Sequence, residues 1–170
     1  YTGAFSVAAT MGGATKTTSV DVANRSLEKT KEQFAVNGID PETQQIYVMD
    51  VFDYFKYALK KQLTFDTVVV DPPSFARTKK RIFSVAKDYG KLVAQITPLV
   101  APKGTLVLST NAANVSESQF QQMIEQGIRE ADGNRRYRIV LKKGLPSDFA
   151  VPVATPLSDY LKVFFVEFNN

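Results

Sequence analysis

The segment DPPSF places an acid, two prolines, a serine and an aromatic residue directly after an apolar strand pattern. Proline has a fixed φ and no N–H, so Pro72 and Pro73 cannot extend a strand ladder. The carbonyls of Asp71 and Pro72, with the Asp71 carboxylate, would form a compact set of acceptors for an amino group on a planar substrate, and Phe75 could stack on its ring. Two prolines alone indicate only a strand end, but the five residues together favour a substrate site. The predicted catalytic residues are Asp71, Pro72, Pro73, Ser74 and Phe75.

Basic residues follow this segment at once, in the sequence ARTKKR. Their cations could hold phosphate groups, although a solvated basic loop is the simpler explanation for such a run taken alone. The predicted phosphate-binding residues are Arg77, Lys79, Lys80 and Arg81. A second basic group alternates along a predicted strand, where it could follow a polynucleotide backbone or protect a sheet edge with charge. It consists of Arg135, Arg136, Arg138, Lys142 and Lys143.

Two further acids end predicted strands, Asp21 after TTSV and Asp50 after IYVM, and the polar cluster Ser109-Thr110-Asn111 ends another after TLVL. Asp21 stands about twenty residues after the glycine of YTGAFS, the spacing at which an acid binds ribose hydroxyls in nucleoside-binding α/β folds. Gly3 would let the backbone approach a ligand, and the start of the next helix favours negative charge. A lone acid or a single glycine has an equally simple structural explanation. Acids in phase with the strand pattern favour a binding crevice.

The elements that must position these residues alternate between helical and strand periodicity. An apolar stripe through Tyr89 predicts one helix, so Tyr89 belongs to the core rather than to a base-stacking site. Ser116 and Gln119 predict a capping box at the start of another helix. The predicted strands are 15–22, 45–50, 65–71, 104–111, 135–142 and 161–168, and the predicted helices lie within 3–11, 23–36, 51–62, 85–96 and 116–131.

This alternation predicts an α/β fold with a Rossmann-like, doubly wound, mostly parallel sheet. The last two strands have no helix between them and are joined by the Pro-rich stretch 146–156, so one of them should be antiparallel. In such a sheet, ligands bind at the carboxyl ends of the strands, where the acids and DPPSF lie. The chain begins at Tyr1, directly in a turn. We therefore expect 1–170 to be one domain of a longer cytoplasmic protein, with a first strand before Tyr1.

The composition excludes several kinds of chemistry. The 170 residues contain no Cys and no His, which removes disulfides, a cysteine nucleophile, the commonest general base and the commonest metal ligand. No metal site is predicted. A net charge of +4 mildly favours polyanionic partners. No apolar run is long enough to cross a bilayer, and no membrane partner is expected.

Four stretches together resemble the class I S-adenosylmethionine-dependent RNA methyltransferases. They are YTGAFS at 1–6, SVDVANRSLEKTKEQFAVN at 19–37, DVFD at 50–53 and DPPSFAR at 71–77. Within that class the chain is most similar to the enzymes of large-subunit (23S) ribosomal RNA that carry an N-terminal PUA domain. The resemblance implies a seven-stranded sheet with helices on both faces and an antiparallel C-terminal strand.

The resemblance also implies a role for each matching residue. Asp21 would bind the ribose of S-adenosylmethionine, Asp50 and Val51 would recognise its adenine, and Thr2 and Gly3 would lie against its methionine part. Asp71 to Phe75 would place a cytosine or guanine of RNA beside the methyl group, and the basic run would bind RNA. The implied cofactor-binding residues are Tyr1, Thr2, Gly3, Phe5, Asp21, Asp50, Val51 and Asp71.

Two departures from the class leave the chemistry open. Its usual first loop has several glycines, whereas this chain has one. Relatives that methylate carbon 5 of cytosine use a Cys, whereas here the corresponding places read DPPSFAR and STNAANVS. A nitrogen nucleophile held by an acceptor such as Asp71 needs no thiolate. One alternative function is an inactive RNA-binding domain of the same fold. The other is a dinucleotide-dependent oxidoreductase, which the absence of a GxGxxG motif disfavours. The sequence leaves open whether the protein forms a homodimer.

Overall fold

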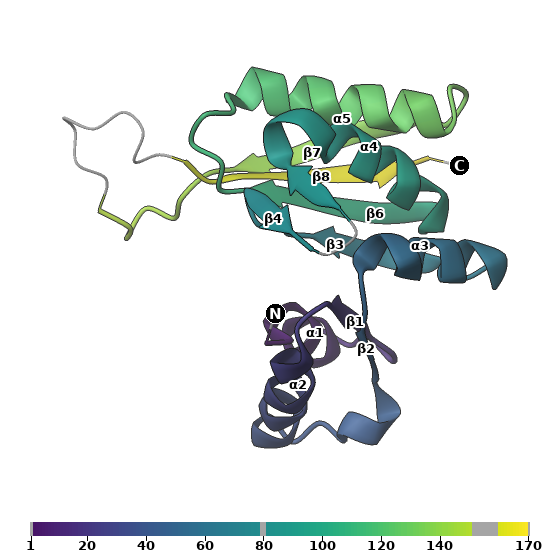
Figure 1. Cartoon of the computed structure of the whole chain (residues 1–170), viewed down its shortest axis with the longest axis vertical. Coiled ribbons are helices and arrows are strands. Elements are labelled where there is room, and N and C mark those ends of the chain that lie inside the picture. The colour runs from purple at the N-terminus through teal and green to yellow at the C-terminus, as the bar shows by residue number, and fades with distance from the viewer. Residues whose placement is uncertain (1, 79–80, 151–159, 170) are drawn as a thin grey trace. The chain divides into compact units, whose positions relative to one another are not determined.

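The computed structural model describes residues 2–78, 81–150 and 160–169. These residues form two compact units, Tyr1–Lys61 and Gln62–Asn170 (Figure 1). All the predicted helices and strands are present, with boundaries that differ by a few residues. We describe each unit by itself.

The first unit is a two-stranded parallel sheet with helices. Thr18 pairs with Gln45 and Asp21 with Val48, so both strands run towards the same edge. Phe34 is fully buried, and Gly38 ends its helix with φ 69° while the next residue, Ile39, donates to the Phe34 carbonyl. A glycine with positive φ and a bond of this kind are typical of the ends of α-helices. The elements are α1 (Ala4–Met11), β1 (Thr18–Asp21), α2 (Asn24–Val36), the 3-10 helix η1 (Pro41–Thr43), β2 (Gln45–Val48) and α3 (Val51–Lys60).

The second unit is a four-stranded sheet in the order β3-β6-β8-β7, with a separate hairpin made by β4 and β5. The strands β3 and β6 are parallel, whereas β8 is antiparallel to both of its neighbours. An antiparallel C-terminal strand was predicted and is confirmed. The elements are β3 (Phe65–Val70), β4 (Phe75–Arg77), β5 (Ile82–Ser84), α4 (Val85–Ile96), the 3-10 helix η2 (Thr97–Leu99), β6 (Val100–Thr110), α5 (Glu117–Ala131), β7 (Tyr137–Lys143) and β8 (Lys162–Phe168).

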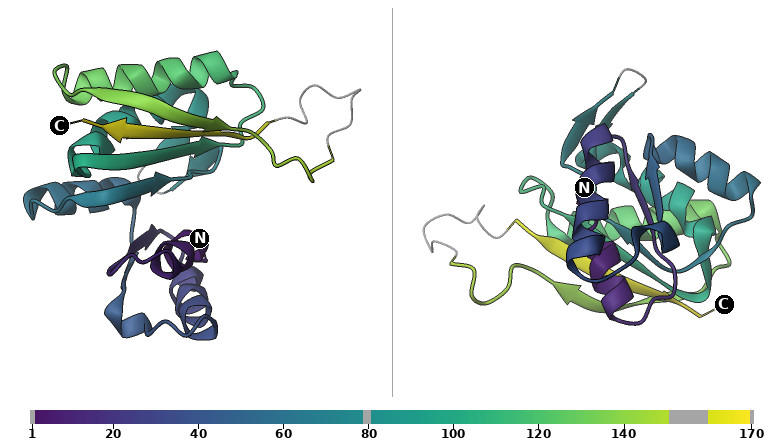
Figure 2. Two further views of the ribbon diagram at one scale, coloured as in Figure 1. Left: turned by 180° about the vertical axis from the view of Figure 1, so that it is seen from behind. Right: turned by 90° about the horizontal axis from the view of Figure 1, so that it is seen from below.

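The core of the second unit lies between this sheet and the helices α4 and α5, which cover the same face (Figure 2, left). Alternate residues of β6 and β8 point into it, because side chains alternate across a strand. The helices contribute residues from the predicted stripes, including Tyr89. Those with 0% exposure include Leu106, Leu108, Val166, Tyr89, Val93, Phe120, Ile124 and Ile128.

Two features of the predicted fold need correction. The described residues form no seven-stranded sheet; their strands divide into sheets of two and four, besides the β4–β5 hairpin. That hairpin was not predicted, because each of its strands has only three residues. Helices on both faces of one sheet stay a prediction, and most of the Pro-rich stretch 146–156 lies outside the described residues.

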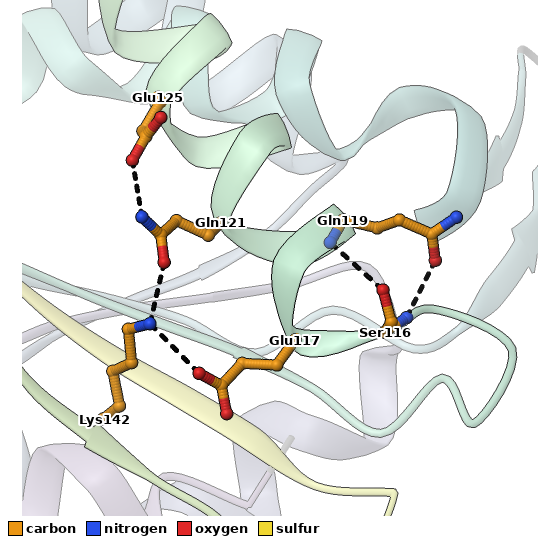
Figure 3. Close-up of polar contacts among 6 residues, drawn as sticks. All are labelled: Ser116, Glu117, Gln119, Gln121, Glu125 and Lys142. Atoms are coloured by element: carbon orange, nitrogen blue, oxygen red, sulfur yellow. Dashed lines mark hydrogen bonds and ion pairs between the residues drawn. The ribbon is translucent and has the colours of Figure 1, made fainter.

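The start of α5 confirms the predicted capping box (Figure 3). The Ser116 hydroxyl accepts from the Gln119 N–H at 3.2 Å, and the Gln119 side-chain carbonyl accepts from the Ser116 N–H at 2.9 Å. Beside it, the Lys142 ammonium on β7 donates to Glu117 at 3.0 Å and to Gln121 at 2.7 Å. These contacts tie the sheet to the helix that covers it.

Three members of the second basic group have structural roles on or just before β7, a strand at the edge of the described sheet. Besides Lys142, Arg138 pairs with Glu167 at 2.9 Å. The Arg135 guanidinium donates to the carbonyls of Thr97, Val100 and Ala101 at 2.6, 2.6 and 3.0 Å, and its carbon lies 3.9 Å from the centre of the Phe168 ring. Partial burial lowers the pKa of Arg135, while the nearby Asp132 carboxylate opposes that shift.

We expect Arg135→Ala to lower the free energy of unfolding by about 2–4 kcal/mol, because it removes charged hydrogen bonds and a cation–π contact. The matched control is Arg138→Ala, which removes an exposed ion pair and should cost less than about 1 kcal/mol. Urea unfolding of both variants measures the difference. Equal losses would show that Arg135 has no special structural role.

Candidate functional site

Two of the predicted cofactor-binding acids lie at the same edge of the two-stranded sheet. Asp21 is the last residue of β1, and Asp50 comes two residues after β2 ends. The N–H of Met49 donates to the Asp21 carbonyl at 2.9 Å, which continues the pairing to this edge. The sequence therefore placed both acids correctly at the carboxyl ends of adjacent parallel strands.

Each acid is fixed by a hydrogen bond to the backbone two residues further on. Oδ1 of Asp21 accepts from the Ala23 N–H at 2.7 Å, and Oδ1 of Asp50 accepts from the Phe52 N–H at 2.9 Å. Such contacts are typical of Asp at turns and helix starts. Val51 opens α3 beside Asp50 and is half-buried. Both carboxylates thus have their orientation set by the fold.

Thr2 and Gly3 directly precede α1, and Phe5 is the second residue of that helix. Gly3 has φ 79°, and a Cβ built there would lie 2.5 Å from Cγ2 of Thr30 on α2. Close packing against α2 therefore explains the glycine without a ligand, so its ligand-binding role stays a prediction. Phe5 is 58% exposed, and Tyr1 lies outside the described residues.

The second unit positions Asp71 through the neighbouring strand. Val70 pairs with Leu108, so Asp71 and Ser109 are next to each other beyond that pair. The Ser109 hydroxyl donates to Oδ1 of Asp71 at 2.5 Å. Among the residues that the structure describes, no other side chain or backbone group donates to the exposed Asp71 carboxylate. Its second oxygen, Oδ2, is therefore available to a substrate.

Ser109 is held in turn by a hydrogen bond from a core residue. The hydroxyl of Tyr89 donates to the Ser109 carbonyl at 2.9 Å. Burial raises the pKa of Tyr89 well above its ordinary value, and the Asp71 charge adds to the shift. Tyr89 therefore stays a neutral donor in the core, as predicted, and does not stack on a ligand.

The rest of the DPPSF segment is held by the loop after β6. The Ser74 hydroxyl donates to Oδ1 of Asn111 at 2.6 Å, and the Ser74 carbonyl accepts from the Val85 N–H at 3.1 Å. One residue beyond Asn111, the Ala112 carbonyl accepts from the ammonium of Lys162 at 3.0 Å. Lys162 is only 8% exposed. Ser74 is therefore bonded both to the loop after β6 and to the first residue of α4.

The sequence placed Ser109 and Asn111 at the edge of the expected crevice, but it assigned no specific contact to them or to Lys162. Ser109 and Asn111 belong to a polar cluster at a strand end, which was the available signal. Lys162 carried a weaker signal: it occupies the buried phase of the alternating strand β8, where a charge is unusual.

Phe75 and Arg77 lie on β4, and Arg81 directly precedes β5. Phe75 is 62% exposed, and Arg77 is also exposed. The backbone of Arg81 bonds to Thr78 and closes the hairpin, whereas Lys79 and Lys80 lie outside the described residues. Their roles in binding RNA stay predictions. Within the described ranges, no cluster of acids could hold a metal, and no helix is long and apolar enough to span a bilayer.

The α/β fold and the acids at its strand ends define a nucleoside-binding class of protein. Residues 1–156 match the S-adenosylmethionine-dependent methyltransferase family, and the chain belongs to it. The chain is 54% identical over 167 residues to a Bacillus subtilis (strain 168) protein provisionally named ribosomal RNA large subunit methyltransferase YwbD, covering 98% of this chain and 42% of that protein.

Two further similar proteins are also named as methyltransferases. Ribosomal RNA large subunit methyltransferase K of Neisseria meningitidis serogroup B is 41% identical over 113 residues, which cover 65% of this chain and 32% of that protein. A solved structure of SMU.776, a provisionally assigned methyltransferase complexed with SAH, has a TM-score of 0.89 and 48% identity, covering 98% of this chain and 43% of that one. The chain therefore spans less than half the length of these relatives.

We expect Gly3→Ala to lower the free energy of unfolding by about 2–4 kcal/mol, because it combines a strained φ with a clash against Thr30. Gly38→Ala is the control: it has a similar φ of 69° but nothing within 4 Å of the added Cβ, so it reports the strain alone. Thermal or urea unfolding measures both.

The same test can isolate the clash. In a Thr30→Ala background, which removes Cγ2, the additional cost of Gly3→Ala should fall towards that of Gly38→Ala. An unchanged cost would mean that contact with α2 does not explain the glycine.

Proposed function

We propose that this chain is the catalytic domain of an enzyme that transfers a methyl group from S-adenosylmethionine to a base of large-subunit ribosomal RNA. The observation that carries the proposal is the geometry of the DPPSF segment. Its acid is oriented by Ser109, its serine is held by Asn111, and its aromatic ring is 62% exposed. Family membership and the names of the relatives support the proposal.

The first unit has groups that fit the cofactor. Asp21 and Asp50 are carboxylates with set orientations, which suit ribose hydroxyls and the adenine amino group. Thr2, Gly3 and Phe5 lie at the start of α1, where the methionine part would bind. When bound, the cofactor supplies an electrophilic methyl group on a sulfonium. The SAH in the SMU.776 structure supports this assignment.

We expect the full-length protein to bind S-adenosylmethionine, and Asp21→Asn to weaken that binding by roughly ten- to a hundredfold, the loss of a charged hydrogen bond. Asparagine keeps the oxygen that accepts from Ala23, so the turn should survive. The control is Asp40→Asn, because the Asp40 carboxylate caps a 3-10 helix in the same way, with the Glu42 N–H at 3.0 Å.

Isothermal titration calorimetry measures these affinities. Binding that both variants keep would remove Asp21 from the cofactor site. A wild-type protein that does not bind the cofactor would overturn the proposed function.

The second unit has groups that fit the target base. Oδ2 of Asp71 can accept a proton from an amino or ring nitrogen, and the carbonyls of Asp71 and Pro72 can accept hydrogen bonds from it. Phe75 can stack on the ring. A base within a paired region would first have to leave the stack, which costs a few kcal/mol. The resemblance to ribosomal RNA methyltransferases favours a cytosine or guanine as the target. We propose a nitrogen nucleophile, because these 170 residues contain no Cys to activate carbon 5.

We expect Asp71→Asn to slow methyl transfer at least about a hundredfold, because the proton acceptor loses its charge. Ser109→Ala, which frees the Asp71 carboxylate to rotate, should slow it roughly tenfold. The control is Asp66→Asn, an exposed acid on the same strand, which should leave the rate unchanged. Transfer of radiolabelled methyl to ribosomal RNA measures the rates.

Normal transfer by Asp71→Asn would exclude Asp71 as the proton acceptor. A wild-type protein that binds both cofactor and RNA without transferring methyl would instead be an inactive RNA-binding domain.

The proposal includes a seven-stranded sheet. In a doubly wound sheet the first strand lies between the second and the fourth. If β1 and β2 are the second and third strands and β3 is the fourth, a strand preceding Tyr1 would complete a seven-stranded sheet. We place that strand, and a PUA-type domain before it, in a longer cytoplasmic protein.

A further inference from the structure

The β4–β5 hairpin has two different faces. Arg77 pairs with Ile82, and Ala76 pairs with Phe83. Because paired residues of antiparallel strands share a face and neighbours alternate, Phe75, Arg77 and Ile82 lie on one face. Ala76 and Phe83 lie on the other. We call the face with Phe75, Arg77 and Ile82 the outer face.

Packing explains the inner face but not the outer one. Phe83 is 6% exposed, and its strand packs against α4. By contrast, Phe75 and Ile82 are 62% and 61% exposed. The hairpin extends away from the four-stranded sheet (Figure 2, right). Two large apolar side chains on one small exposed surface indicate contact with another molecule.

The hairpin is anchored at both ends, so its outer face is held in place. At its base the Val85 N–H donates to the Ser74 carbonyl at 3.1 Å, and at the other end the Thr78 N–H donates to the Arg81 carbonyl at 2.9 Å. Ser74 is further held by Asn111. The outer face is therefore continuous with the segment that carries Asp71.

The charge of the outer face favours a polyanion. Within the described ranges, Arg77 forms no ion pair with any acid. Arg77 shares its face with two exposed apolar side chains, and the sequence around it, ARTKKR, has no acid. Apolar contacts to bases combined with a cation for the phosphate are typical of surfaces that bind single-stranded nucleic acid.

We propose that the outer face binds an unpaired nucleotide adjacent to the target base in RNA. Ile82 packs against the base or sugar of that nucleotide, Arg77 pairs with its phosphate, and Phe75 stacks on the target. The substrate is then an unpaired region of RNA rather than a continuous duplex. This inference rests on the proposed function for the identity of the target, and it assigns a binding role to Ile82.

The test is RNA binding by the full-length protein, followed by fluorescence anisotropy. The probes are a short single-stranded RNA and the same sequence in a duplex. We expect tighter binding to the single strand. Ile82→Ala should lower the affinity for the single strand roughly five- to tenfold, because it removes an apolar contact. Leu141→Ala is the matched control, since Leu141 is an exposed aliphatic residue, 41% exposed, on the edge strand β7.

Arg77→Ala should also weaken single-strand binding, but with a different signature. It should reduce the slope of log affinity against log salt by about 0.7, the contribution of one phosphate contact on a single strand. Ile82→Ala should leave that slope unchanged. Arg138→Ala is the control for Arg77→Ala, because Arg138 is an exposed arginine already paired with Glu167.

Several results would overturn the inference. They are an affinity of Ile82→Ala equal to that of Leu141→Ala, a duplex that binds as tightly as the single strand, and self-association of the free protein through Ile82, measured by light scattering. Methyl transfer measured in parallel separates this inference from the proposed function. An active enzyme whose RNA binding ignores Ile82 contradicts only the inference, whereas an inactive protein whose single-strand binding needs Ile82 contradicts only the proposed function.

Discussion

The hydrogen bond from Ser109 to Asp71 depends on the register between β3 and β6, and the substrate side of the site depends on that bond. Val70 and Leu108 are paired, so the next residues along each strand can meet. A slip of one residue would turn every side chain of one strand to the opposite face and separate Ser109 from Asp71. Register is fixed by the buried residues of β6, Leu106 and Leu108, which must face α4 and α5. The position of a surface carboxylate is thus determined by the apolar core.

The two units orient their acids in different ways. In the first unit, Asp21 and Asp50 bind backbone N–H groups two residues further along the chain. In the second, Asp71 is held by a side chain from another strand, because Pro72 and Pro73 supply no N–H. A proline pair therefore leaves local carbonyls free for a substrate but transfers the task of orienting the acid to Ser109. This explains why sequence reasoning found Asp71 and missed the importance of Ser109.

Much of the fold could be predicted because its helices and strands have clear apolar periods, and the acids could be placed because strand ends gather at one edge. Contacts between distant segments could not be predicted in this way. Lys162 is far from Ala112 in sequence, and its burial follows only from the pairing of β8 with β6. The β4–β5 hairpin was missed because three residues are too few to show a strand period. The prediction of one doubly wound sheet came from the alternation of helices and strands, and its seven strands came from the resemblance. The described strands do not form such a sheet.

The hairpin also shows why exposure can be more informative than the identity of a motif. Phe75 belongs to a recognised segment, whereas Ile82 lies beyond the basic run and had no predicted role. Only the strand pairing shows that both lie on one face with Arg77 between them in sequence. Burying Phe83 is enough to hold the hairpin against α4, so stability gives no reason for Ile82 to be apolar. An exposed aliphatic residue that the fold does not require is best explained by what it contacts when the substrate binds.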